Sequence, residues 1–154
     1  MRDSFQIKLI TNHKDYPYDL LLLADETVAA IDKYLYDSLV YVVFETAKPI
    51  AVFCLYPVDS ETLEIKNIAV SPDFQSMGLG SQLLEFIKTN YQQYPNLIVG
   101  TADCGFAQIR FYERNGFVKY AIRKDFFIEN YELPIYENGT LLKDMIMLRY
   151  TLDS

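Results

Sequence analysis

The stretch from Val70 to Leu84 constrains the fold of this chain most strongly, because it predicts a strand, a loop and a helix in direct succession. The apolar run that ends at Val70 is typical of a buried strand, Pro72 breaks it, and apolar residues then recur at helical spacing. Gly78 and Gly80 lie in the loop, where glycine permits a positive φ and lets a ligand approach the main chain. The first N–H groups of the helix point into the same space, so the stretch predicts an anion site, above all for a phosphate.

Two nucleotide-binding motifs can be compared with this loop, and neither matches. A Walker A loop requires Gly-Lys followed by Ser or Thr, which the chain lacks. A dinucleotide-binding fingerprint requires a third Gly or Ala three positions after Gly80, where Leu83 stands, and several strands precede the loop. Gly-x-Gly alone is equally compatible with a tight turn that binds nothing, so this alternative stays open.

Length and composition predict one α/β domain spanning residues 1–154. A formal net charge of −7 argues against nucleic acid as a partner and weakly favours cationic small molecules. Cys54 and Cys104 occur without a signal-peptide pattern, so we expect free thiols and a cytoplasmic location. No apolar run approaches the ~20 residues of a membrane span, and with His13 as the only histidine and no Cys-x-x-Cys we expect no metal site.

Seven segments have the apolar, β-branched and aromatic character of strands. They are residues 5–10, 39–44, 50–58, 63–70, 97–101, 118–122 and 145–152. Around residues 24–35 we expect one amphipathic helix or a broken pair of helices, and further helices are expected from the glycine loop to about Tyr94 and over 105–115. The strand, helix and strand around the glycine loop imply a right-handed parallel crossover, whereas 39–44 and 50–58 form a predicted hairpin with a turn at 45–49.

The six residues from Gln75 to Gly80 follow the strand that ends at Val70, and they resemble motif A of the GNAT superfamily of acyl-CoA-dependent N-acyltransferases. That motif reads Gln or Arg, two residues, Gly, one residue, and Gly or Ala. A second block, from Phe111 to Phe117, is similar to the family's helix-end signature of a Tyr four residues before Gly-Phe. The resemblance covers the chain from about residue 39 to its C-terminus.

The resemblance implies a mostly antiparallel sheet of about seven strands, flanked by helices, in which a parallel pair splays apart to hold acetyl-CoA. The backbone of Ile68, Ala69 and Val70 would pair with the pantetheine arm like an added strand. The pyrophosphate would bind the loop amides without any cation. These amides belong to Gln75, Ser76, Met77, Gly78, Leu79, Gly80 and Ser81. Many relatives have Asn at the position of Asp103, so Asp103 is also expected at the cofactor, although an ionised carboxylate cannot donate a hydrogen bond.

The resemblance also implies acetyl transfer to a primary amine by direct attack on the thioester. An alkyl amine with a pKa of about 10.4 is mostly protonated at neutral pH, so a base would help. Glu64 stands where several family members carry such a base, and the alternative is a solvated strand carboxylate. Tyr112 corresponds to the tyrosine near the cofactor sulfur, where it would donate a proton or a hydrogen bond; the alternative is a packed helix residue. Cys104 has no histidine nearby in sequence and is expected to be a bystander.

The acceptor is the least constrained part of the prediction. The aromatic and acidic loop 124–139 predicts a lid for a small-molecule or peptide amine, with Glu129, Tyr131 and Glu132, and also Glu137, beside its charge. The alternative is a long β-excursion that packs Phe126, Phe127 and Leu133, and Asp25 and Glu26 face either the acceptor or solvent. A catalytically silent acyl-CoA-binding module and a purely structural domain remain alternative functions. A homodimer is expected only because dimers are the commonest assembly.

Overall fold

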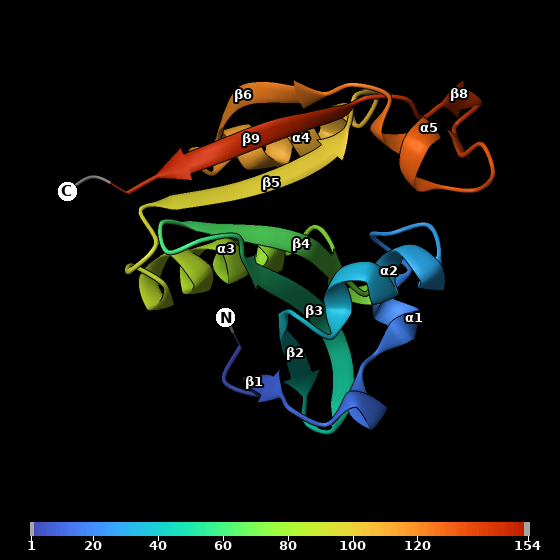
Figure 1. Cartoon of the computed structure of the whole chain (residues 1–154). Coiled ribbons are helices and arrows are strands. Elements are labelled where there is room, and N and C mark those ends of the chain that lie inside the picture. The colour runs from blue at the N-terminus through green and yellow to red at the C-terminus, as the bar shows by residue number, and fades with distance from the viewer. Residues whose placement is uncertain (1, 153–154) are drawn as a thin grey trace.

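A seven-stranded mixed sheet organises the protein, and the computed structural model describes residues 2–152 of it (Figure 1). The sheet order is β1-β2-β3-β4-β5-β9-β6, and only β4 and β5 pair in parallel. The strands are β1 (Phe5–Ile10), β2 (Leu39–Glu45), β3 (Lys48–Pro57), β4 (Thr62–Val70), β5 (Asn96–Ala102), β6 (Val118–Arg123) and β9 (Met145–Thr151). The helices are α1 (Tyr18–Leu21), α2 (Val28–Leu35), α3 (Leu79–Asn90), α4 (Phe106–Arg114) and α5 (Phe126–Asn130). The seven predicted strands and the mixed α/β class are confirmed.

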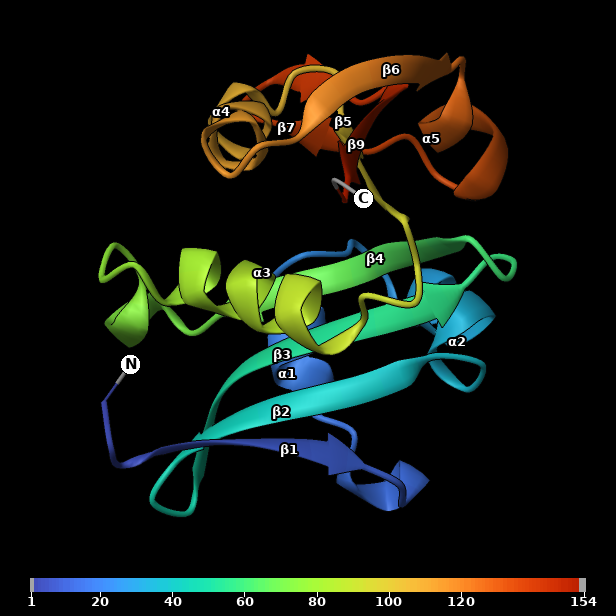
Figure 2. The same ribbon diagram turned by 90° about the vertical axis from the view of Figure 1, so that its left-hand side faces the viewer.

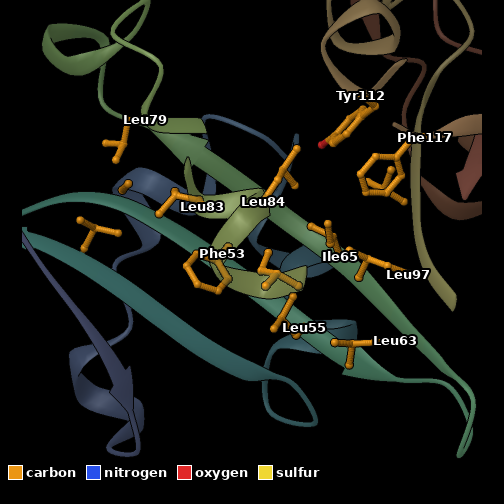
Figure 3. Packing of buried hydrophobic residues seen from close by; sticks show 14 of the residues in the cluster. Phe53, Leu55, Leu63, Ile65, Leu79, Leu83, Leu84, Leu97, Tyr112 and Phe117 are labelled. Carbon is orange, nitrogen blue, oxygen red and sulfur yellow. The ribbon is translucent and has the colours of Figure 1, made fainter. Parts of the chain in front are cut away.

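Helices cover both faces of the sheet, which explains why β3 is apolar without a break from Ile50 to Leu55. Phe53 and Leu55 face one core, where Leu83 and Leu84 of α3 pack together with Tyr112 and Phe117 (Figure 3). Val52 and Cys54 alternate with them and face a second core with residues of α1 and α2, including Leu21, Ile31 and Leu35. Successive side chains of a strand point to opposite faces, so a strand covered on both sides loses the polar half of the alternating pattern.

The parallel pair is short, and this shortness creates the opening in the sheet. Register runs from Thr62 opposite Asn96 to Ile65 opposite Val99, and beyond these positions β4 and β5 are not paired with each other. Cys54 pairs with Asn67 and Leu55 with Ile65, so Lys66 is an extra residue on β4, and such a bulge increases the local twist. Figure 2 shows β5, β6 and β9 lying apart from β1 to β4.

Two sequence expectations needed correction, and one alternative was decided. The first helical segment is the broken pair rather than one helix, because Thr27 caps α2 by accepting a hydrogen bond from the N–H of Ala30 at 3.1 Å. Helix α3 ends at Asn90 rather than near Tyr94, since Tyr91 leaves the helical conformation with φ of −127°. The hairpin turn is shorter than 45–49, because β2 extends to Glu45 and β3 begins at Lys48.

The stretch 124–139 is folded rather than open. It contains α5 and starts a small hairpin of β7 (Tyr136–Glu137) and β8 (Thr140–Leu141) that the sequence pattern did not predict. Phe127 is buried in a third core with Ala102 and Leu142, as the packed-excursion alternative required, but Leu133 is 76% exposed and that part of the alternative is wrong. Two-residue strands carry too little alternation to be recognised in a sequence.

A matched pair of leucines tests the core between α3 and the sheet. Leu84 is fully buried, so Leu84→Ala should lower the free energy of unfolding by about 2–5 kcal/mol. Leu133→Ala changes the same side chain at an exposed position and should alter stability by less than ~0.5 kcal/mol. Urea unfolding of the two variants measures both values, and equal losses would contradict the assigned core.

Candidate active site

A cleft of about 300 Å³ lies where β4 and β5 separate. Its walls come from β4, β5, α4, the segment between α1 and α2, and the stretch that carries α5 and β7. Elements far apart in sequence therefore meet at one opening in the sheet. Ligands in sheets with parallel strands bind outside the carboxyl ends of those strands, and this cleft has that position.

The edge of β4 that faces the cleft is open for pairing with an extended ligand. Ile68, Ala69 and Val70 line the cleft, while their other edge pairs with β3 from Ala51 to Phe53. The side chain of Gln75, which also lines the cleft, donates a hydrogen bond from Nε2 to the carbonyl oxygen of Val70 at 2.8 Å. Backbone groups at such an edge need partners, so the edge fits an amide-bearing arm such as pantetheine.

The glycine loop leads from this edge to the N-terminus of α3. Gly78 is the N-cap residue, with φ of +79°, and no side chain of the described residues caps the helix. The N–H of Gln82 donates to the carbonyl of Gly78 at 3.2 Å, so the N–H groups of Leu79, Gly80 and Ser81 precede the first intrahelical bond. Donors of this kind at the positive end of a twelve-residue helix fit a pyrophosphate.

The two glycines of the motif are required for different physical reasons. A Cβ on Gly78 would meet no protein atom within 4 Å, so the left-handed backbone is what excludes other residues there. A Cβ on Gly80 would come within 3.1 Å of Cζ of Phe111, so Gly80 allows α3 to approach α4. Ser76 also has a positive φ, of 63°, and Met77 contributes to a separate hollow beside the loop with Phe74.

Tyr112 reaches the cleft from α4 and is 5% exposed. Its ring packs against Phe117 at 5.5 Å between centroids, and Figure 3 shows the hydroxyl on the side away from Phe117. Within the described residues this hydroxyl makes no hydrogen bond, and burial raises the pKa of Tyr112 above its usual value. Tyr112 therefore stays a neutral phenol with a donor for a ligand in the cleft.

A second cavity of about 220 Å³ adjoins the cleft and contains Glu64. The two hollows share lining residues, including Asp25, Lys66 and Tyr131. Glu64 is only 5% exposed, and its carboxylate lies 3.2 Å from Nζ of Lys66 and 3.8 Å from a guanidinium nitrogen of Arg123. A carboxylate this buried requires such partners, so Glu64 is not the solvated strand residue of the alternative.

Asp25 joins the two sides of the opening. Its carboxylate accepts hydrogen bonds from the hydroxyl groups of Tyr131 at 2.6 Å and Tyr34 at 3.1 Å. Asn67 in turn donates to the Tyr34 oxygen at 3.1 Å. Burial and the nearby Asp25 raise the pKa of both tyrosines, so they remain donors to the carboxylate. Sequence reasoning left Asp25 undecided and missed Tyr34 and Asn67, because these residues are distant in the chain and form no local motif.

The predicted acceptor and cofactor residues are not all in contact with the two hollows. Tyr131 lines both of them, but Glu129 and Glu132 are exposed and line neither. Glu26 and Glu137 line the cleft, and burial together with the charges of Glu137 and Asp25 raises the pKa of Glu26. The roles proposed for Glu129 and Glu132 stay predictions.

Asp103 lies next to the cleft rather than in its wall. Its N–H donates to the carbonyl of Asp144 at 3.0 Å, and its Oδ1 is buried without a hydrogen-bond partner among the described residues. Neighbouring Gly100, Thr101 and Gln108 do line the cleft, and the sequence analysis did not single them out. A contact between Asp103 and the cofactor stays a prediction.

The two cysteines have the character of unreactive thiols. Cys54 is buried, and burial raises its pKa to about 12. Burial and the charges of Glu137 and Asp103 also raise the pKa of Cys104. A raised pKa leaves little of the nucleophilic thiolate, which supports the interpretation of Cys104 as a bystander.

Residues 2–152 contain neither a metal-binding cluster nor a membrane-spanning helix. Between residues 2 and 152, no three or more His, Cys, Asp or Glu side chains are grouped so as to hold a metal ion. Over the same range, no helix is long and apolar enough to cross a membrane.

This arrangement, a sheet with a splayed parallel pair and a glycine loop beside the opening, is the one expected for an acetyltransferase. Residues 36–119 match the family described as the acetyltransferase (GNAT) domain. The chain belongs to the GNAT family of acetyltransferases.

One curated relative and two solved structures are similar to this chain over nearly its whole length. The chain is 35% identical over 145 residues to an uncharacterised N-acetyltransferase of Bacillus subtilis, YvbK, covering 93% of this chain and 94% of the relative. A GNAT family acetyltransferase of Elizabethkingia anophelis, solved with acetyl-CoA bound, is 42% identical with a TM-score of 0.90, over 98% of this chain and 100% of that one. An IAA acetyltransferase of Bacillus cereus is 35% identical with a TM-score of 0.87, over 97% and 100% of the two chains.

Two glycines with the same positive φ test the anion site. Gly78 and Gly139 both have φ of +79° and open space where a Cβ would stand, but only Gly78 borders α3. Both Gly78→Ala and Gly139→Ala should cost about 1–2 kcal/mol of stability. Only Gly78→Ala should also weaken acetyl-CoA binding, by about tenfold, because its methyl group crowds the pyrophosphate. Thermal unfolding and calorimetric titration separate the two effects, and unchanged affinity in Gly78→Ala would contradict the site.

Proposed function

We propose that this protein transfers the acetyl group of acetyl-CoA to a primary amine of a small molecule or peptide, by direct attack in a ternary complex. The observation that carries the proposal is that Glu64 and Tyr112 lie at one opening. Glu64 is a buried carboxylate in the second cavity, and the Tyr112 hydroxyl in the cleft has no hydrogen-bond partner among residues 2–152. Acetyl-CoA bound to the Elizabethkingia anophelis relative supports the choice of donor.

The cofactor residues would act through the backbone. The backbone of Ile68, Ala69 and Val70 would pair with the pantetheine arm. Gln75 would either give up its hydrogen bond to the carbonyl oxygen of Val70, so that the arm can bind this oxygen, or keep that bond beside the arm. The loop amides from 75 to 81 would hold the pyrophosphate. Bound acetyl-CoA supplies an acetyl group activated as a thioester.

Glu64 and Tyr112 would divide the proton chemistry. Glu64 would take the proton of the attacking amine, directly or through a water, from the side of the second cavity. Tyr112 would donate a hydrogen bond at the sulfur as negative charge develops there. Its raised pKa makes a hydrogen bond more favourable than complete proton transfer, because a thiol with a pKa near 8.5 is the stronger acid.

We assign the protein to the cytoplasm on the basis of the free thiols of Cys54 and Cys104. The mechanism uses no metal, nucleic acid or membrane, and a homodimer stays a prediction.

Calorimetric titration and a thiol-release assay with an amine panel test the proposed function. Acetyl-CoA should bind, and at least one primary amine should release CoA. Binding without release across the panel would favour a silent acyl-CoA-binding module instead. No binding of millimolar acetyl-CoA would reject both.

Glu64→Gln should lower kcat by about 10²-fold, the lower end of the usual contribution of a general base, and should change the pH profile of turnover. The affinity for acetyl-CoA should stay nearly unchanged. The matched control is Glu85→Gln, because the Glu85 side chain is 66% exposed on α3 and makes only a surface ion pair with Lys88. Unchanged turnover in Glu64→Gln would remove Glu64 from the mechanism.

Tyr112→Phe should lower kcat by about 10- to 100-fold, in the range of a lost charge-assisted hydrogen bond, with little loss of acetyl-CoA affinity. Stability should be kept, because the hydroxyl has no partner to lose among the described residues. Tyr120→Phe, at a 41% exposed position of β6, is the control. If kcat in Tyr112→Phe equals that of the control, Tyr112 is only a packed helix residue.

A further inference from the structure

The second cavity has a charge balance opposite to that of the whole chain. It contains three cationic side chains, Lys33, Lys66 and Arg123, against two carboxylates, Asp25 and Glu64. The chain itself has a formal net charge of −7. A ligand in this cavity therefore meets a local excess of positive charge. The negative net charge of the chain does not predict which ligands this cavity favours.

Both carboxylates of the second cavity are already engaged. Asp25 accepts hydrogen bonds from Tyr34 and Tyr131 and from the N–H of Glu26 at 2.7 Å. Glu64 is paired with Lys66 at 3.2 Å. A second positive charge on an acceptor would thus find no vacant carboxylate and would be close to three cations.

Arg123 differs from the two lysines because it is ion-paired with Glu64 only at long range, so its N–H groups are free to donate hydrogen bonds. Nζ of Lys33 donates to the carbonyl of Asn130 at 3.1 Å, and Lys66 is paired with Glu64. Arg123 approaches Glu64 only to 3.8 Å, which is longer than a hydrogen bond, and its guanidinium makes no hydrogen bond within residues 2–152. Its side chain is 41% exposed at the end of β6, so it reaches the cavity from the rim. A guanidinium in this position presents a fork of N–H donors that matches a carboxylate or phosphonate.

We propose that Arg123 is a specificity-determining residue that binds an anionic group of the acceptor, so that the substrate is a small amine that also carries a carboxylate or a comparable oxyanion. This rests on the proposed function and names its substrate class. The cavity volume of about 220 Å³ is below the roughly 300–1,000 Å³ of sites for drug-sized ligands, so the acceptor is of amino-acid size rather than a long polyamine. The amine of such a molecule would lie toward Glu64 and the cleft, while its anion lies at Arg123.

A panel of matched acceptors tests the substrate class with the wild-type protein. The panel consists of α-, β- and γ-amino acids, the amides of the same acids, and diamines of similar length, each with acetyl-CoA in a thiol-release assay. At least one acid should exceed both its amide and the diamines by about 10- to 100-fold in kcat/KM. Amides or diamines that react as well as the acids, or acids that do not react at all, would overturn the inference.

Substitution of Arg123 tests the residue. Arg123→Gln should reduce the acid-to-amide ratio of kcat/KM by about 10- to 100-fold, mainly through KM of the acid. Loss of the ion pair with Glu64 should change kcat for the acid and the amide alike, so it does not alter the ratio. The ratio cancels the different basicity of the two amines and any general loss of folded protein. Arg110→Gln removes the same charge from the exposed side of α4 and should leave the ratio unchanged. An unchanged ratio in Arg123→Gln would reject the role of Arg123.

Acetyl-CoA titrations of the same samples distinguish a failure of the proposed acetyl transfer from a failure of the inferred substrate class. Arg123 lies outside the glycine loop and the wall of the cleft, so Arg123→Gln should bind acetyl-CoA like the wild type. If acetyl-CoA binds and amides or diamines are acetylated without preference for acids, only the inference about the acceptor fails. If acetyl-CoA does not bind at all, the proposed function fails and the inference fails with it.

Discussion

The early end of the pairing between β4 and β5 is the constraint on which the rest of the structure depends. After Ile65 and Val99 the two strands leave one another, and the edge of β4 beyond Lys66 has lost its sheet partner on that side. Backbone N–H and carbonyl groups in such a position require another partner. The contact of Gln75 with the carbonyl of Val70 satisfies one of them, and a ligand with amide groups can satisfy the others. The hydrogen bonds that β4 and β5 do not make with each other beyond Ile65 and Val99 are therefore available for a ligand.

The separation of the strands also sets how the two hollows are connected. Residues of β4 alternate between the two faces, so neighbouring positions reach different sides of the opening. Ile65 packs in the core with α3, whereas Glu64 points into the second cavity between Lys66 and Arg123. The cost of burying this carboxylate is offset only while its cationic partners remain. The cleft and the second cavity therefore meet along β4, at Ile65 and Lys66.

The segments around the opening are joined by contacts that span most of the chain. Asp25 binds Tyr131 across 106 positions, and Lys33 binds the carbonyl of Asn130 across 97. These bonds join α2 and the segment before it to α5 and Tyr131, so hydrogen bonds position two walls of the second cavity. A hydrogen-bond network with most of its groups satisfied makes the walls of the cavity more rigid.

Much of the fold was predictable because it depends on local patterns. Apolar runs and turn residues predicted all seven strands of the main sheet, and the Gln75–Gly80 and Phe111–Phe117 motifs predicted the family that the comparisons confirm. The pattern failed where tertiary contacts override it. Tyr91 ends α3 early while its hydroxyl bonds to Tyr41, and the short strands β7 and β8 have too few residues to show a period.

The sequence by itself determined the strand, glycine loop and helix, because φ at Gly78 and the N–H groups of α3 follow from residues that are adjacent in the chain. It also determined the identity of Tyr112 and Glu64 as candidates. Only the tertiary structure decided the acceptor side: it left Glu129 and Glu132 in solvent and brought Asp25, Arg123 and Tyr131 together at one cavity. The physical reason is that charge complementarity at a site depends on distances through space, and residues from separate parts of the chain have no spacing in sequence that records those distances.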